Sequence, residues 1–154
     1  MPRVALLSVG NIAGKSEVPV NFFLASVKPD IVYLFVSEDS RGIAENIISQ
    51  TYLDPKNVNY LHLPDPLSIN SCYEVVCEAF ADAVKKNPKA WYSIDLTTGT
   101  KPMAFALMLR TFQLLDDEEI DGRFNISYTR KTDDENEPML LCNLPDKRLA
   151  GGEM

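Results

Sequence analysis

The sequence predicts an α/β protein with a mostly parallel sheet covered by helices on both faces. Two observations predict this class. Short apolar runs, of the kind that form strands buried on both faces, alternate with longer segments whose apolar residues recur at helical spacing. Strict alternation of strands and helices is typical of parallel sheets, because a helix makes each return crossing. At 154 residues, the chain is long enough for one domain with a substantial core.

Four strand–helix pairs followed by two strands account for the chain in order. The apolar runs that predict strands are residues 4–9, 31–36, 58–63, 90–94, 124–129 and 139–142. Helices are expected from about Ser16, which is a good N-cap residue, after the polar loop 37–40, from about Ser68, and from about Lys101 to residue 115. The face of the first helix that is expected to be buried consists of Val18, Phe22 and Ala25.

This order of elements predicts a Rossmann-like fold of six strands with the sheet order 3-2-1-4-5-6. We expect residues 1–144 to form the domain and residues 145–154 to be a tail or a truncated linker.

The charge of the chain argues against one class of partner. Fifteen basic and 22 acidic side chains give a formal net charge of −7 and an isoelectric point near 4.7. Proteins that bind long nucleic acid usually present a basic face to the phosphates, so this function is disfavoured. A small anion held by a few amides and lysines remains possible.

The cysteines and the N-terminus predict a cytoplasmic protein with no membrane partner. The three cysteines, Cys72, Cys77 and Cys142, are odd in number and contain no CxxC pair, which favours a reducing compartment. The apolar stretch at the N-terminus is too short for a signal peptide or a membrane span.

Two polar loops are expected to form the functional site. In an open parallel sheet, ligands bind beyond the carboxyl ends of the strands, where the strand order reverses. With the predicted order, that point lies between the first and fourth strands. The loops that follow these strands, residues 8–11 and 95–102, are also the most unusual polar stretches of the chain.

The second loop carries the stronger signal. Thr97, Thr98, Gly99 and Thr100 offer hydroxyl donors and unobstructed amides, and Lys101 adds a full positive charge. Pro102 suits the first position of a helix, with Lys101 at the cap or beside it, and a helix N-terminus adds unpaired N–H groups. We therefore expect a site for phosphate or another anion. The alternative is a threonine-rich cap on a buried helix.

The first loop is expected to line the same site. Gly10 permits close approach of the backbone, and Ser8 and Asn11 can hydrogen-bond a ligand. Ser37 follows the second strand and could line the same cleft. The alternative for the first loop is an ordinary turn between a strand and a helix.

Several other patterns are weaker. The segment 10–16 resembles a phosphate-binding P-loop but has three residues between its glycines instead of four, so a nucleotide triphosphatase is a minor alternative. Glu38 and Asp39 are more typical of a helix start than of a ribose site, and His62 is expected to be a packed residue or a residue at the rim of the sheet. No cluster has the spacing of a metal site, and we expect neither a metal nor another cofactor.

The helix that follows Lys101 predicts a partner. Residues 103–109 are seven consecutive apolar residues, which cover every side of the helix. A helix on the surface of a sheet needs only one apolar stripe, so the remaining face is expected to pair with a second copy of the chain in a homodimer. The alternative is deeper burial of the helix within one chain.

The residues 95–103, DLTTGTKPM, resemble the D-x-[ST]-x-G-T-K-x-M signature of CRISPR-associated Rossmann-fold (CARF) domains. The turn 8–11, SVGN, is similar to the first motif of this family, although Asn11 stands where many members carry Thr. The order of elements also matches, so the resemblance extends to about Cys142.

The resemblance implies a homodimer that binds a cyclic oligoadenylate, most simply cyclic tetra-adenylate, in type III CRISPR antiviral signalling. It also implies a metal-independent ring nuclease, in which a ribose 2′-hydroxyl attacks the adjacent phosphorus. Lys101 and the loop amides would stabilise the phosphoryl charge, and Ser8 would be a positioning residue. The alternative is a non-catalytic sensor domain or a protein that sequesters the messenger. The ligand contacts expected are Gly10, Asn11, Ser37, Thr97, Thr98, Gly99 and Thr100.

Overall fold

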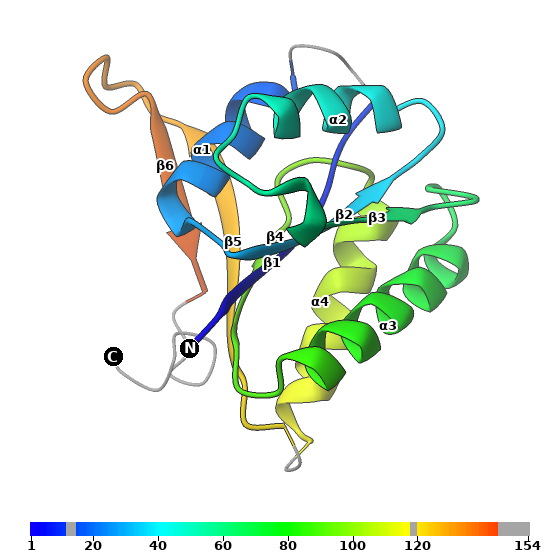
Figure 1. Ribbon diagram of the computed structural model, residues 1–154. Coiled ribbons are helices and arrows are strands. Elements are labelled where there is room, and N and C mark those ends of the chain that lie inside the picture. Colours follow the sequence, from blue (N-terminus) through cyan, green and yellow to red (C-terminus); the bar gives the residue numbers. More distant parts are fainter. Residues whose placement is uncertain (12–14, 118–119, 145–154) are drawn as a thin grey trace.

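The computed structural model describes residues 1–11, 15–117 and 120–144, which form one sheet with two helices on each face (Figure 1). The elements in order are β1 (Arg3–Ser8), α1 (Glu17–Val27), β2 (Ile31–Val36), α2 (Arg41–Ser49), a short 3-10 helix (Pro55–Asn57), β3 (Val58–His62), α3 (Ile69–Lys86), β4 (Trp91–Asp95), α4 (Lys101–Leu115), β5 (Arg123–Lys131) and β6 (Met139–Asn143).

The sheet has the order β3-β2-β1-β4-β5-β6, which confirms the predicted fold class and strand order. The pairs from β3 through to β5 are parallel, and β6 runs antiparallel to β5. The order reverses between β1 and β4, so the loops that follow these two strands lie next to each other at one edge of the sheet.

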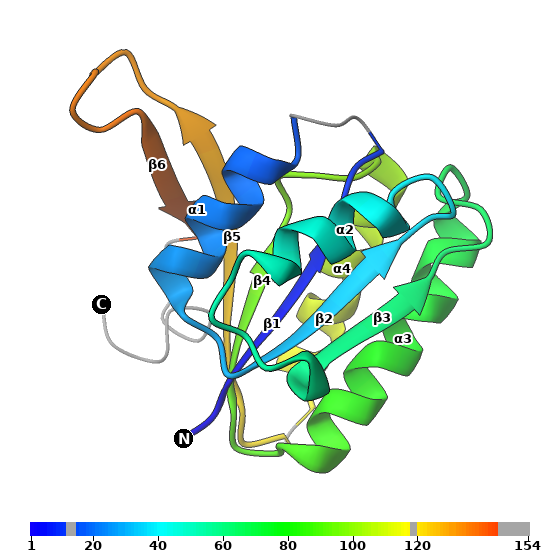
Figure 2. The ribbon, with the colours of Figure 1, turned by 45° about the horizontal axis from the view of Figure 1, so that its top comes forward.

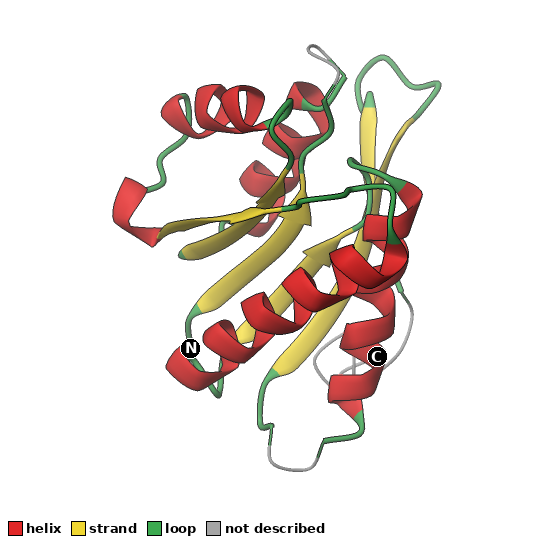
Figure 3. Cartoon of the chain, turned by 90° about the vertical axis from the view of Figure 1, so that its right-hand side faces the viewer, coloured by secondary structure: helices red, strands yellow, loops and turns green. Residues whose placement is uncertain are grey.

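The core has two halves, one on each face of the sheet. They lie under the helices that cover the two faces (Figure 3). In β1, Val4 and Leu6 pack on the side of α3 and α4, whereas Ala5 and Leu7 pack on the side of α1 and α2. All four side chains are fully buried. Because helices cover both faces, four consecutive positions of the strand are apolar rather than every second one.

The predicted face of the first helix was wrong. The structure buries Val20, Phe23 and Leu24, whereas Val18 is 54% exposed and Ala25 is also exposed. Apolar residues surround this helix, so their spacing is compatible with more than one buried face, and contact with the sheet decides between them. The predicted tail 145–154 lies outside the described residues, as do residues 12–14 of the P-loop-like segment.

The outer surface of α4 is apolar. Phe105, Leu109 and Phe112 recur at the spacing of one helical stripe and are 52%, 37% and 40% exposed. Deeper burial within the chain, the alternative considered from the sequence, is therefore excluded for these three side chains. No helix in the described part of the chain is long and apolar enough to cross a bilayer.

Candidate ligand-binding site

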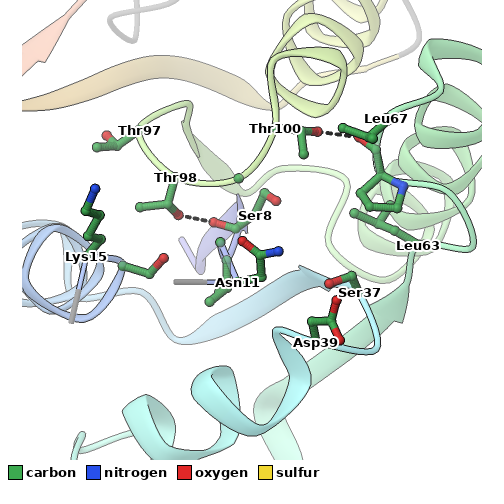
Figure 4. A pocket seen from close by; sticks show the side chains of 15 residues that line it. Ser8, Asn11, Lys15, Ser37, Asp39, Leu63, Leu67, Thr97, Thr98 and Thr100 are labelled. Atoms are coloured by element: carbon green, nitrogen blue, oxygen red, sulfur yellow. Dashed lines mark hydrogen bonds between the residues drawn. The ribbon is translucent and has the colours of Figure 1, made fainter. Parts of the chain in front are cut away.

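A pocket of about 440 Å³ lies at the carboxyl ends of the strands, where the strand order reverses (Figure 4). Residues from the loops after β1, β2, β3 and β4 line it. Eight of the nine site residues expected from the sequence are among them: Ser8, Gly10, Asn11, Ser37, Thr97, Thr98, Gly99 and Thr100. The fold therefore brings together residues that are up to 92 positions apart in the sequence.

Hydrogen bonds to neighbouring segments hold the β4–α4 loop in place. The Thr98 hydroxyl donates to the carbonyl oxygen of Ser8, and the Thr100 hydroxyl donates to the carbonyl oxygen of Pro66. The Thr97 hydroxyl accepts a hydrogen bond of 2.7 Å from the Thr129 N–H. All three hydroxyl groups thus support the loop, and backbone N–H groups other than that of Thr97, which Asp95 accepts, are the donors that the loop could offer to a ligand.

Glycines allow the two central loops to touch. Gly99 has a φ of 95°, which favours glycine, and a Cβ there would overlap the Ser8 Oγ and lie 2.7 Å from the Ser8 Cβ. A Cβ on Gly10 would lie 3.5 Å from the Gly99 nitrogen. The backbones of the two loops therefore approach each other closely, and only a residue without a side chain fits at position 99.

The N-terminus of α4 points to the same place. Thr100 is the N-cap residue, and its Oγ1 accepts a 3.3 Å hydrogen bond from the Met103 N–H. Lys101 lies beside the cap, which is one of the two places expected from the sequence; it is the exposed first residue of the helix and does not line the pocket. The first N–H groups of a helix have no partner within it and carry partial positive charge, which favours an anion nearby.

The pocket also contains residues that the sequence analysis missed. Lys15 and Asp39 are the charged residues among the described residues that line it, and Lys15 lies at the opposite end from Asp39 in Figure 4. Asp39 lies in the turn before α2, so its expected place near a helix start is correct, but it also faces the pocket. Leu63, Pro66 and Leu67 complete one wall. The signal that could have found them is their place in the loops after β2 and β3, at the same edge of the sheet.

Asp95, the last residue of β4, is buried and holds the start of the β4–α4 loop in place. Its side chain is only 2% exposed, and its two carboxyl oxygens accept 3.0 Å hydrogen bonds from the Thr97 N–H and the Ser127 hydroxyl. Burial raises the pKa of the Asp95 carboxyl, and the hydrogen bonds from Thr97 and Ser127 oppose this rise. The carboxyl group thus ties the start of the β4–α4 loop to β5.

Two other predictions can be located. His62, expected to be a packed or a rim residue, ends β3 with an exposed side chain, as a rim residue does, and it does not line the pocket. Within the described residues, no group of three or more His, Cys, Asp or Glu side chains is placed to hold a metal ion.

The fold and the pocket define a class of protein, namely a Rossmann-like domain with a pocket between two polar loops at the point where the strand order reverses. No protein-family model matches the chain, and no curated protein matches it. Several solved structures are similar in fold, and three of them are described next.

The chain is similar to Csm6 of Enterococcus italicus bound to cyclic hexa-2′-fluoro-hexa-dAMP, with a TM-score of 0.63 and 14% identity over 86% of this chain and 34% of that one. It is similar to Can2 from Sulfobacillus thermosulfidooxidans in complex with cyclic tetra-adenylate, with a TM-score of 0.60 and 16% identity over 82% of this chain and 31% of that one. It is also similar to a type III CRISPR defence DNA nuclease activated by cyclic oligoadenylate, with a TM-score of 0.58 and 17% identity over 91% of this chain and 19% of that one. The chain spans about a third or less of each protein, and the likeness shows a shared fold.

Proposed function

We propose that this protein binds a cyclic oligoadenylate of the size of cyclic tetra-adenylate, as a homodimer, in type III CRISPR antiviral signalling. The observation that carries the proposal is the contact between the β1–α1 and β4–α4 loops, which forms an amide-rich pocket at the N-terminus of α4. Proteins with the same fold are described in complex with cyclic oligoadenylates, which supports this class of ligand.

The pocket suits the phosphates of such a ring despite the acidic composition of the chain. The backbone N–H groups at Gly99 and Thr100 lie at the positive end of α4, and Lys15 adds a charge on the opposite loop. Fixed N–H groups bind a phosphate without the loss of side-chain freedom that a flexible donor would suffer. A net charge of −7 acts over the whole surface, whereas these groups act at short range.

Dimerisation is supported by an apolar surface on one side of the molecule. We call this surface the α4 stripe; it consists of Phe105, Leu109 and Phe112. Tyr128 and Leu140, which are 51% and 39% exposed, face the same side of the sheet, because alternate residues of β5 (Phe124 and Ile126) pack into the core beside α4. A self-complementary contact through the α4 stripe would bring two pockets to one twofold axis, where a symmetric ring could bind both.

Ring cleavage is the further step that we propose for this site. The 2′-oxygen of one ribose would bond to the adjacent phosphorus as the bond from phosphorus to the 5′-oxygen breaks. The 2′ proton would pass through water to the departing 5′-oxygen, leaving a 2′,3′-cyclic phosphate and a 5′-hydroxyl. Lys101 lies outside the pocket but directly follows the pocket-lining Thr100, and from the start of α4 its long side chain would reach the phosphoryl oxygens and stabilise them together with the loop amides. Ser8, packed beneath Gly99, would position the loop.

One experiment tests both parts of this proposal, the binding of the ring and its cleavage. The protein is incubated with cyclic tetra-adenylate and EDTA, binding is measured by calorimetry, and the products are separated by chromatography. Linear products with cyclic-phosphate ends, lost in Lys101→Ala, are expected for the ring nuclease. Binding of an intact ring would instead indicate the sensor or sequestering function. Absence of binding would contradict the proposed function as a whole.

The dimer is tested by sedimentation. Phe105→Glu places a charge in the α4 stripe and is expected to convert the dimer to a monomer, because an unpaired charge would be buried in the interface. Ile69→Glu is the matched control, since Ile69 is 47% exposed on α3, outside the α4 stripe. A monomeric unaltered protein, or a Phe105→Glu variant that remains dimeric, would contradict the interface.

A further inference from the structure

A second cavity, of about 740 Å³, adjoins the pocket between the β1–α1 and β4–α4 loops, which we call the first cavity from here on. It lies between the start of α1 and the β5–β6 hairpin, which extends past the body of the sheet in Figure 2. Lys15 and Thr97 line both cavities, and in Figure 4 they lie together at one end of the first cavity. A ligand that passes between these two residues could therefore occupy both cavities at once.

The lining of the second cavity differs in character from that of the first. Val18, Pro19, Pro138 and Met139 give it apolar walls. Its charged residues are two lysines and three carboxylates, the latter in the run 133–135, so the local charge is 2 − 3 = −1. A phosphate would be repelled by this balance, whereas an uncharged flat ring whose polar edge carries N–H donors would find both apolar contact and acceptors.

The floor of the second cavity contains an unsatisfied polar group. Thr129 is 3% exposed, and its hydroxyl has no hydrogen-bond partner among the described residues. Its own N–H is held by the Thr97 hydroxyl, so the floor is connected to the β4–α4 loop by a direct hydrogen bond. A buried hydroxyl without a partner costs free energy, and a partner that enters with a ligand would recover it.

We propose that the second cavity binds one adenine base of the ring whose phosphate lies in the first cavity. This inference rests on the proposed function and extends it to the part of the site that selects the base. The faces of the purine would pack between Val18 and Pro19 on one side and Met139 on the other, and the exocyclic amine would donate to a carboxylate of the hairpin loop. The hairpin, rather than the anion-binding loops, would then determine which nucleobase is accepted.

The test fills the cavity and changes the base. Val18→Trp places an indole at the wall of the second cavity, at an exposed helical position, and is expected to lower the affinity for cyclic tetra-adenylate by at least about tenfold. Gln50→Trp is the matched control, because Gln50 is an exposed residue at the C-terminal end of α2 and lines neither cavity. Cyclic tetra-inosinate, which lacks the exocyclic amine, is expected to bind the unaltered protein about tenfold more weakly.

The outcomes separate this inference from the function on which it rests. Binding of the ring by Val18→Trp as tight as by Gln50→Trp would overturn the base site while leaving the proposed function intact. Equal affinity of the unaltered protein for the adenylate and inosinate rings would do the same, and that measurement does not depend on the folding of any variant. Failure of the unaltered protein to bind either ring would overturn the proposed function and this inference together.

Discussion

The two loops that meet in the first cavity are built differently. In the β4–α4 loop, all three threonine hydroxyls are hydrogen-bonded to other segments, and Gly99 has a conformation that other residues rarely adopt. In the β1–α1 loop, Gly10 has no such conformation, and the nearest atom to a Cβ there is a hydroxyl that can rotate, that of Ser16. The difference indicates that the β4–α4 loop is a fixed frame of amides, whereas Gly10 in the β1–α1 loop is less constrained.

The strongest test of this comparison is Gly99→Ala. The new Cβ would overlap Ser8 and would require an unfavourable positive φ, at a cost of roughly 2–5 kcal/mol in the free energy of unfolding. Movement of the loop to relieve the overlap would displace the amides, and the affinity for cyclic tetra-adenylate is expected to fall by about 100-fold or more. Chemical denaturation and calorimetry measure the two effects.

Gly42→Ala is the matched control for this substitution. Gly42 lies in α2, where a Cβ would have no atom within 4 Å. Because alanine favours the helix, this variant is expected to be more stable than the unaltered protein by about 0.5–1 kcal/mol, with unchanged affinity. A Gly99→Ala variant that behaves like Gly42→Ala would show that the β4–α4 loop is not a fixed frame.

Asp95 provides the second test, because its carboxyl group anchors the fixed loop. Asp95→Ala leaves the Thr97 N–H and the Ser127 hydroxyl without an acceptor, at a cost of about 1–3 kcal/mol in the free energy of unfolding. Asp95→Asn keeps one acceptor and removes the charge, so it is expected to be milder. Ser49→Ala, at an exposed position of α2, serves as a control for general effects of small polar substitutions.

The effect of Asp95→Asn is expected to depend on pH. Burial raises the pKa of Asp95 in the folded protein, so the stability that this group contributes is full below its unfolded pKa and is lost as the pH rises through the folded pKa. The stability of the unaltered protein relative to Asp95→Asn should therefore decrease with rising pH across this window. Denaturation curves at several pH values measure this difference in stability. A difference that does not change with pH would contradict a raised pKa for Asp95 in the folded protein.

The sequence predicts the frame of the site better than its contacts. Apolar strands with few alternating polar positions require helices on both faces, and the strand order that is usual for such sheets places Gly10 beside Gly99. The uses of the threonine hydroxyls were not predictable, because each depends on a partner such as Pro66 or Thr129 from a distant segment. The same reason explains why Lys15 was missed and why Lys101 was expected in the pocket but lies outside it.

Lys15 gives a third test, directed at the β1–α1 side of the pocket. Lys15 lines both cavities, and Lys15→Ala is expected to lower the affinity for cyclic tetra-adenylate by about fivefold to tenfold at low salt, with a smaller loss at high salt. Lys15→Arg keeps the charge and should retain most of the affinity. If Lys15→Ala binds as tightly as the unaltered protein, the contribution of this loop to the charge of the site would be excluded.

The smallest effect is expected from Gly10→Ala, and it completes the comparison of the two loops. The added Cβ would lie 2.8 Å from the Ser16 hydroxyl oxygen, which can rotate away, and 3.5 Å from the Gly99 nitrogen, an ordinary contact. The cost is therefore expected to be below about 1 kcal/mol, since a side-chain rotation rather than a backbone shift relieves it. The double variant Gly10→Ala with Ser16→Ala should recover the stability lost to this contact. A loss as large as that of Gly99→Ala, not recovered in the double variant, would mean that both loops are equally rigid.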